Sequence, residues 1–155
     1  MGVASAQTKV AVINMQQAVL STADIKKQST DLEAKYKPRQ TAIEQLRADI
    51  DGIQQKLQAG QGKLTPAAEQ DLTIDGQRKQ RTLQRMSQDL QDEVDGVRND
   101  ILAAAGRRMA EVIRKLADER GLDVVVESSS TLFFKAALDL TADATAAYDK
   151  AYPPK

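Results

Sequence analysis

The side chains that most often carry out covalent or metal chemistry are scarce in this sequence. Its 155 residues include no cysteine and no histidine, which excludes thiol nucleophiles, Ser-His-Asp triads and the usual zinc or copper sites. The acidic pairs Asp92 with Glu93 and Asp49 with Asp51 lack the spacing of three or four residues that places carboxylates side by side on a helix. The run Ser128–Ser130 forms no nucleophile elbow and has no base. We therefore predict a protein that is not an enzyme, with no catalytic residue, no metal ligand and no cofactor.

Charged residues could act in binding instead. A basic band without an acidic residue is followed by an acidic stretch over residues 89–100. The band could attract acidic segments, lipid head groups or nucleic acid, or it could be a solvated helix face with neighbouring ion pairs. Because 22 Lys and Arg balance 22 Asp and Glu, no global field favours nucleic acid or an anionic membrane. The band consists of Arg78, Lys79, Arg81 and Arg85.

The composition predicts long exposed helices rather than a wide core. Apolar residues make up 41% of the chain, but aromatic residues only 3%, and there is no tryptophan. Alanine, glutamine, leucine and charged residues dominate, which is the composition of long exposed helices.

A long helix is predicted to begin after Ser21 and Thr22, which are suitable N-caps. Ten positions then follow one another at spacings of three and four, and eight of them are apolar, which is a heptad seam. Pro38 is the one misfit and should kink this helix or remove a backbone hydrogen bond near Ala34. The seam positions are Ile25, Ser29, Leu32, Tyr36, Arg39, Ile43, Leu46, Ile50, Ile53 and Leu57.

A turn over residues 59–66 (AGQGKLTP) separates this helix from a return helix. Thr65 precedes Pro66 at the first helical position, which is a helix start. The return helix reaches about Arg120 and must run antiparallel to the first, because the turn is short. Its apolar stripe is Leu83, Met86, Leu90, Val94, Val97, Ile101, Ala105, Met109, Val112 and Leu116.

The seam has two interpretations. It could simply join the two helices, or part of it could stay open to a guest. Between Leu72 and Leu83 the seam positions of the return helix fall on Gly76 and Lys79, so we expect poor pairing there. A two-helix hairpin cannot enclose its seam completely, and partly open apolar grooves suit weak binding of many unfolded chains.

Short β-branched runs near both ends of the chain predict strands. Residues 9–14 (KVAVIN) and 122–127 (LDVVVE) have the signature of strands, and Thr131–Phe134 is a third, short one after a serine turn. Gly121 is placed to end the return helix. A last helix is predicted to follow residues 139–141.

The predicted fold class is therefore α+β and predominantly helical. A long antiparallel helical-hairpin, or coiled-coil, arm covers residues 25–116 and has its tip near 59–66. A small β-containing oligomerisation body combines residues 9–24 with 117–155. Residues 1–8 are interpreted as the remnant of an export signal.

That interpretation depends on Ala4, Ser5 and Ala6 before Gln7, which resemble the small-residue end of a secretory signal. We expect an exported protein whose signal has been replaced by a short start; the alternative is an ordinary flexible N-terminus. No run approaches the roughly 18 apolar residues that a membrane span needs.

The apolar residues of the body are too few for a free-standing core, and three short strands leave open edges. Joining several copies would remove both problems. We therefore predict an oligomer interface at Val10, Val12, Ile13, Val124, Val125, Val126, Leu132, Phe133 and Phe134.

The two ends of the chain, in this order around a heptad hairpin, resemble the Skp/OmpH family of periplasmic chaperones. The resemblance lies in KVAVIN followed by Met15 and Gln16, in RGLDVVVESSSTLFF from Arg120, and in LDLTADATAAYDKAY, and it covers nearly the whole chain from Lys9. The positions that match the family's strand and D-[IL]-T patterns are Gly121, Leu122, Asp123–Glu127, Asp139, Leu140 and Thr141.

The resemblance implies a periplasmic homotrimer in which strands of three subunits form a central body and three arms enclose a cavity. Such proteins hold unfolded outer-membrane β-barrel proteins there without ATP. Family members are often strongly basic, whereas this chain is neutral, which leaves at most a weak contact with anionic lipid. The predicted client-binding residues are Ile50, Ile53, Leu57, Leu64 and Leu72, with Arg78, Lys79 and Arg81 steering.

Two other classes of function fit parts of the sequence. A structural or adaptor protein would dock its hairpin on one folded envelope partner by coiled-coil pairing. A nucleic-acid-binding hairpin is the third class, and zero net charge together with few aromatic residues argues against it.

Overall fold

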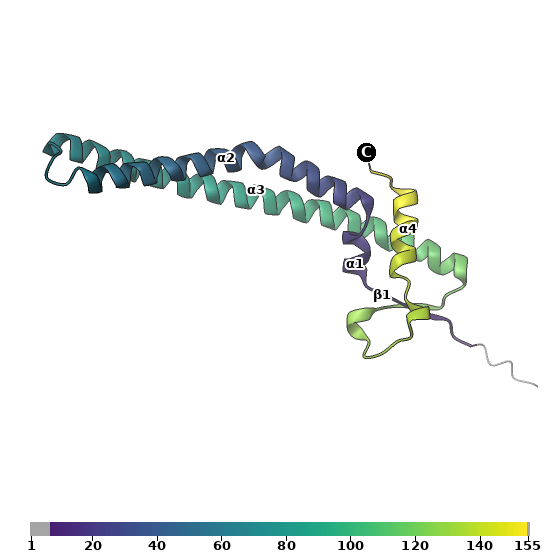
Figure 1. Ribbon diagram of the computed structural model, residues 1–155. Coiled ribbons are helices and arrows are strands. Elements are labelled where there is room, and N and C mark those ends of the chain that lie inside the picture. The colour runs from purple at the N-terminus through teal and green to yellow at the C-terminus, as the bar shows by residue number, and fades with distance from the viewer. Residues whose placement is uncertain (1–6, 155) are drawn as a thin grey trace, which may run out of the picture. The chain divides into compact units, whose positions relative to one another are not determined.

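The computed structural model of the chain describes residues 7–154. Helices dominate it, and the predicted α+β, mainly helical fold class is confirmed (Figure 1). The predicted signal remnant at Ala4–Ala6 lies outside the described residues. In chain order the elements are β1 (Val10–Ile13), α1 (Met15–Leu20), α2 (Ala23–Ala59), α3 (Pro66–Arg120), β2 (Val124–Glu127), two 3₁₀ turns (Ser128–Ser130 and Ala136–Leu138) and α4 (Thr141–Ala151).

The chain divides into two compact units. The first, here called the terminal unit, contains the described residues up to Thr30 and from Arg98 onward. The second, the hairpin unit, is Asp31–Val97. It contains most of α2, the turn and the first part of α3.

Within the hairpin unit, α2 and α3 run antiparallel, as the short turn predicts (Figure 1). The predicted seam is confirmed along α2, where Tyr36, Ile43, Ile50 and Ile53 are buried. Helix α2 continues through Pro38 without a break, so the cost of this proline is the hydrogen bond that its missing N–H cannot donate.

The turn at the end of the hairpin is closed by backbone hydrogen bonds. Gly60 donates to the Lys56 carbonyl at 2.9 Å, and Leu64 donates to the Gly60 carbonyl at 2.9 Å. Gly62 has a φ of 74°, which favours glycine. Thr65 caps α3 by accepting the Ala68 amide on its hydroxyl at 3.3 Å, which confirms the predicted helix start.

Replacing Gly60 by alanine should destabilise this turn. A methyl group there would lie 2.5 Å from the Leu64 side chain and 2.9 Å from the Lys56 carbonyl oxygen, and relieving such overpacking costs about 1–3 kcal/mol. Gly52→Ala is the matched control: it lies inside α2 with nothing within 4 Å and should stabilise the helix by about 0.5–1 kcal/mol. Urea unfolding followed by circular dichroism compares them, and equal stability of the two variants would contradict the argument.

The terminal unit contains a two-stranded parallel sheet. Val10 pairs with Val124, and the register continues to Ile13 with Glu127. The prediction of a third strand at Thr131–Phe134 is wrong: this segment is an irregular loop between the two 3₁₀ turns. Its β-branched and aromatic residues fit a pleated surface, but strand formation requires a partner backbone, and the described chain supplies none for this segment.

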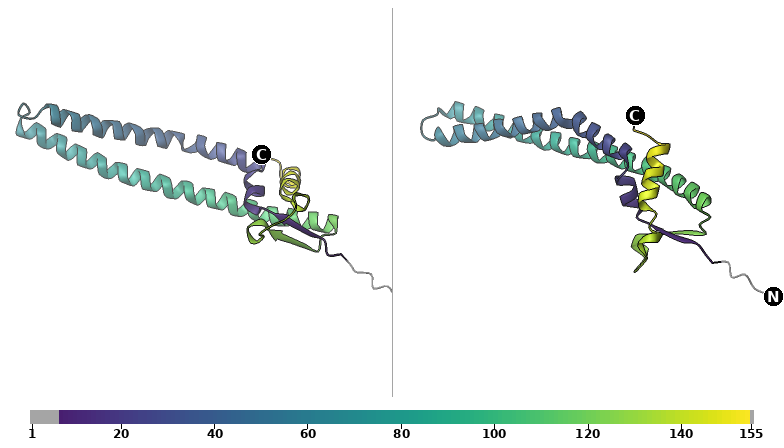
Figure 2. Two further views of the ribbon diagram at one scale, coloured as in Figure 1. Left: turned by 60° about the horizontal axis from the view of Figure 1, so that its bottom comes forward. Right: turned by 45° about the vertical axis from the view of Figure 1, so that its right-hand side comes forward.

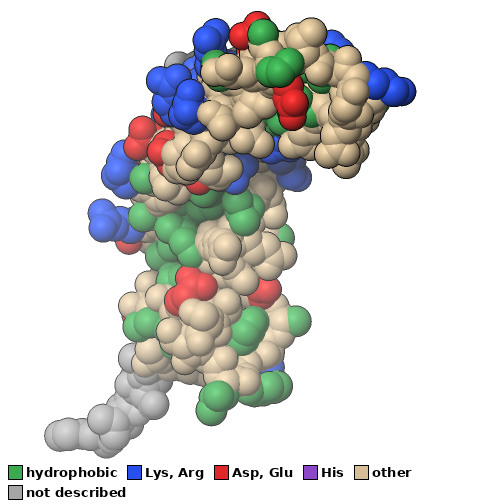
Figure 3. All heavy atoms as spheres, turned by 90° about the vertical axis from the view of Figure 1, so that its left-hand side faces the viewer, with side chains coloured by type: hydrophobic (Ala, Val, Ile, Leu, Met, Phe, Trp, Pro, Cys, Tyr) green, Lys and Arg blue, Asp and Glu red, His purple; other side chains and the backbone are tan. Residues whose placement is uncertain are grey.

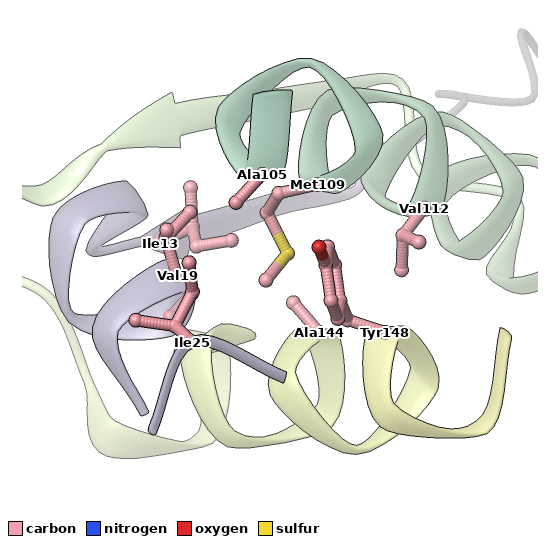
Figure 4. Packing of buried hydrophobic residues seen from close by; sticks show 9 residues of the cluster. Ile13, Val19, Ile25, Ala105, Met109, Val112, Ala144 and Tyr148 are labelled. Atoms are coloured by element: carbon pink, nitrogen blue, oxygen red, sulfur yellow. The ribbon is translucent and has the colours of Figure 1, made fainter. Parts of the chain in front are cut away.

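The core of the terminal unit joins segments from both ends of the chain. α1 and α4 contact each other beside the last turns of α3 (Figure 2). Met109 from α3 points between Ile13, Ala144 and Tyr148, as Figure 4 shows. The short helix α1 was not predicted, because six residues capped by Asn14 give too little periodicity to detect.

Hydrogen bonds between side chains and backbone fasten the N-terminal segment to the C-terminal one. The Asn14 amide donates to the Thr141 hydroxyl at 2.9 Å, and the Ala23 amide at the start of α2 donates to the Asp149 carboxylate at 2.8 Å. Asp139 accepts the Thr141 amide at 2.9 Å; the Thr141 hydroxyl first, and this amide second, favour the charged carboxylate and lower the pKa of Asp139. The two ends of the chain are thus held together by paired polar groups as well as by the core.

Candidate functional site

The inner part of the hairpin unit has a core of its own. Tyr36, Ile43 and Leu90 are buried against one another. Partly buried neighbours extend this cluster at each side, and they are Leu32, Leu83, Met86 and Val94.

A polar contact fixes the register of the two helices beside this cluster. The Tyr36 hydroxyl donates to one oxygen of Glu93 at 2.8 Å, and the Arg39 guanidinium donates to the other. These bonds favour the charged carboxylate, so the Arg39 guanidinium first, and the Tyr36 hydroxyl second, lower the pKa of Glu93. Arg39 and Glu93 are exposed, so their ion pair contributes mainly to helix register rather than to stability.

The predicted client-binding residues fall into two groups. Ile50 and Ile53 are buried in the seam, whereas Leu57, Leu64 and Leu72 are only half-buried. The second group is therefore accessible to another chain without any separation of the helices.

The expectation of poor pairing at Gly76 and Lys79 is wrong. A methyl group at Gly76 would lie 3.3 Å from the Ile53 side chain, so the absence of a side chain lets the helices approach closely. Lys79 forms an ion pair with Asp49 at 3.5 Å. Apolar surface remains open nearer the turn instead.

Ile74, whose side chain is 44% exposed, was not among the predicted client-binding residues. It lies two residues from both Leu72 and Gly76, so it falls off the seam of α3. An apolar residue at an off-seam position of a predicted helix is the signal that could have identified it.

A polar hollow of about 570 Å³ lies beside the turn. Leu57 is its apolar residue, and glutamines dominate the remainder. Since an amide side chain both donates and accepts hydrogen bonds, this surface can pair with N–H and C=O groups of a bound chain. The lining consists of Asp51, Gln54, Gln55, Leu57, Gln58, Gln61, Glu69 and Thr73.

The basic band is divided by the fold. Arg78, Arg81 and Arg85 line an open hollow of about 620 Å³ on α3 together with Asp89, whereas Lys79 is engaged by Asp49. Basic and acidic side chains are interspersed on the face shown in Figure 3. The band is thus a local attraction for acidic segments rather than an extended basic surface.

The predicted oligomer interface is also split by the fold. Val12 and Ile13 are buried inside the terminal unit, and Val10, Val125, Val126 and Phe134 are half-buried. Val124, Leu132 and Phe133 are exposed, Phe133 to 81%. These three side chains are the ones that a second chain could cover.

Other kinds of site find no support in the part of the chain that the structure describes. No group of three or more carboxylates there is placed to hold a metal ion. Among the helices of residues 7–154, none combines the length and the hydropathy that crossing a membrane requires.

Comparisons with known proteins match nearly the whole chain. The sequence profile of the family described as "Outer membrane protein (OmpH-like)" matches residues 9–148. The chain is 25% identical over 138 residues to the Skp-like protein of Pseudomonas aeruginosa, covering 89% of this chain and 82% of that protein. It is 26% identical over 142 residues to the chaperone protein Skp of Pectobacterium atrosepticum, covering 89% and 84%.

The fold also matches a solved structure. The crystal structure described as that of an OmpH-like outer membrane chaperone from Caulobacter crescentus superposes with a TM-score of 0.78 at 19% sequence identity. The match covers 100% of this chain and 92% of the other. At this identity the likeness is one of fold.

Proposed function

Because this chain belongs to the family of OmpH-like outer membrane proteins, we propose that it is an ATP-independent holdase chaperone of the periplasm. It binds unfolded outer-membrane β-barrel proteins and prevents their aggregation. The hairpin unit contacts the client, and the terminal unit assembles several copies, three in the form that the resemblance implies.

The observation that carries this proposal is the mixed surface around the turn of the hairpin. Leu57, Leu64 and Leu72 are half-buried and Ile74 is exposed, and they lie on a unit whose other surface is rich in glutamine. Apolar contacts of this kind bind any exposed hydrophobic segment weakly, and amide groups satisfy its unpaired backbone. Such a surface suits many unfolded clients better than one folded partner.

Charge adds a weaker element to the same proposal. Arg78, Arg81 and Arg85 attract acidic client segments. Lys79, engaged by Asp49, contributes less. A weak contact with anionic lipid head groups would use the same three arginines and would be sensitive to salt.

Dilution of an unfolded client tests the proposal. A urea-unfolded outer-membrane β-barrel protein is diluted into buffer without ATP, with and without this protein, and light scattering is recorded. We expect scattering to be suppressed at about one oligomer per client. Undiminished aggregation, with the protein shown to be folded by circular dichroism, would favour the adaptor, and a fixed complex with a folded envelope protein would then be sought.

Replacing both Leu57 and Leu64 by glutamine should weaken client protection while leaving the oligomer intact. Each change removes accessible apolar surface, and covering such surface stabilises a complex by roughly 25 cal/mol per Å². Neither residue lies in the terminal unit. We expect the concentration that halves scattering to rise about tenfold, which corresponds to roughly 1.4 kcal/mol.

Leu138→Gln is the control for this pair of changes, because Leu138 is an exposed leucine of the terminal unit. It should leave protection unchanged. Equal protection by wild type and by the Leu57 and Leu64 double variant would remove these two residues from the client surface.

A further inference from the structure

The loop between the two 3₁₀ turns projects apolar side chains into solvent. Leu132 is fully exposed and Phe133 is 81% exposed. The start of the loop is nevertheless fixed, because the Thr131 amide donates to the Ser128 carbonyl at 3.0 Å and its hydroxyl to the Glu127 carbonyl at 3.3 Å. Adjacent large apolar residues on a fixed projection mark a contact surface.

The same unit carries an apolar hollow. Its volume is about 520 Å³, within the range of roughly 300–1,000 Å³ typical of binding pockets. Met15, Val19, Leu20 and Leu102 supply its apolar walls. Ser128 and Ser129, which precede the loop, are among its lining residues, whereas Leu132 and Phe133 are not.

Charges complete the match between the projection and the hollow. The Glu127 carboxylate lines the hollow and accepts the Met15 amide at 3.2 and 3.3 Å and the Ser128 hydroxyl at 3.4 Å. Within residues 7–154, neither Glu127 nor Lys135, which follows Phe134 in the loop, has a charged partner at ion-pair distance. The loop therefore carries the cation that the hollow lacks.

We propose that the projection Leu132–Phe133 of one copy of this chain sits in the hollow of a second copy, where Lys135 approaches Glu127. The inference rests on the self-assembly included in the proposed function, and adds the residues and the symmetry of the contact. Burying Leu132 and Phe133 against Leu20 removes exposed apolar surface from both copies. Lys135 selects the register, since its ammonium group meets an unpaired carboxylate.

This contact also determines the type of assembly. The projection and the hollow are different surfaces of one chain, so the contact is heterologous, and each copy gives one surface and receives the other. A heterologous contact with a closing rotation produces a ring. Two loops packing on each other would instead give a two-fold dimer.

Cross-linking tests the contact without background, because the natural chain contains no cysteine. Full-length Leu20→Cys, carrying a mass tag, and untagged Phe133→Cys are refolded together and treated with a short thiol-to-thiol cross-linker. We expect the dominant product to join a tagged chain to an untagged one. Leu138→Cys, another exposed leucine position, replaces Phe133→Cys in the matched control and should give only a trace of that product.

Two outcomes overturn the proposal. Linkage of Phe133→Cys alone, as strong as in the mixture, would indicate a two-fold contact between loops. If the mixture of Leu20→Cys and Phe133→Cys gave no more cross-linked product than the mixture with Leu138→Cys, the hollow would not be the docking site. The mass of the wild-type protein by light scattering separates this failure from that of assembly itself: an oligomer without the cross-link refutes only the docking of the projection in the hollow, whereas a monomer refutes both.

A second variant gives an independent reading. Phe133→Asp places a charge in the projection at a residue that its own chain leaves exposed, so the monomer should fold as before by circular dichroism. We expect loss of the oligomer mass at concentrations where wild type is assembled. An unchanged oligomer mass would refute the proposal.

Discussion

Replacement of Tyr148 by alanine is expected to lower the free energy of unfolding by about 3–5 kcal/mol, the range for removing a large buried ring. Tyr148 is completely buried. Its ring packs with Met109 and Ala144 in the core of the terminal unit (Figure 4) and lies 5.2 Å from the ring of Tyr152. This residue joins α4 to α3, so its loss should release the C-terminal helix. Urea unfolding followed by circular dichroism measures the change.

Tyr148→Phe is the matched variant, because it keeps the ring and removes only the hydroxyl. That hydroxyl donates to the buried Asp24 carboxylate at 3.4 Å, and Asp24 keeps a second contact to Arg108 at 3.5 Å. We expect a loss of about 1.5 kcal/mol, as for one hydrogen bond to a charged group. If the alanine variant were no less stable than the phenylalanine variant, the packing argument would fail.

The same residue predicts a pH dependence. Burial raises the pKa of Tyr148 above its ordinary value of 10.0, because the interior disfavours the phenolate. The folded state therefore holds this proton more tightly than the unfolded state does. The corresponding stability is complete below pH 10 and is lost as the pH rises further. Tyr148→Phe should show a smaller decrease in stability at alkaline pH, and an identical decrease would assign it to other groups.

Val125→Asp is expected to dissociate the oligomer and to lower its melting temperature. Val125 is the half-buried residue of β2 that pairs with Ala11 and packs on the core of the terminal unit. A carboxylate there must lose its bound water or force the strand away from α3. We therefore expect the free energy of unfolding to fall by about 3 kcal/mol or more, which is the usual upper limit for one substitution. Light scattering gives the mass, and calorimetry gives the melting temperature.

Val124→Asp controls for the effect on folding. Neighbouring side chains of a strand point to opposite faces, and Val124 is 46% exposed, so its aspartate reaches water. Because Val124 is also one of the exposed residues that a second chain could cover, this control compares folding and not assembly: its circular dichroism spectrum should equal that of the wild type. A Val125→Asp protein with wild-type mass and melting temperature would refute both the strand assignment and its role in assembly.

The long helices were predictable because their signal is local and repeated. The seam from Ile25 to Leu57 spans many turns, and one misfit such as Pro38 does not hide the period. Thr22, Thr65 and Gly121 end or begin helices as predicted, since a cap is determined by a few adjacent residues. The predicted family is confirmed for the same reason, because its characteristic runs are contiguous.

The loop at Leu132–Phe133 was not predictable in the same way. Its residue types favour a strand, but a strand depends on hydrogen bonds to a partner that can come from anywhere in the fold. The exposure of the seam residues could not be predicted from the sequence either, because Ile50 and Ile53 belong to the same apolar stripe as Leu57. Only the close approach of the helices at Gly76 shows that Ile53 is covered.

The sequence by itself determined the helices, their caps, the turn between them, the two strands and the family, because each depends on neighbouring residues or on a short repeat. Only the tertiary structure decided which apolar residues stay exposed and which carboxylates lack a cation. Burial and polar pairing depend on residues far apart in the chain, from the 30 positions between Asp49 and Lys79 to the 112 between Met15 and Glu127, and sequence spacing carries no information about such contacts.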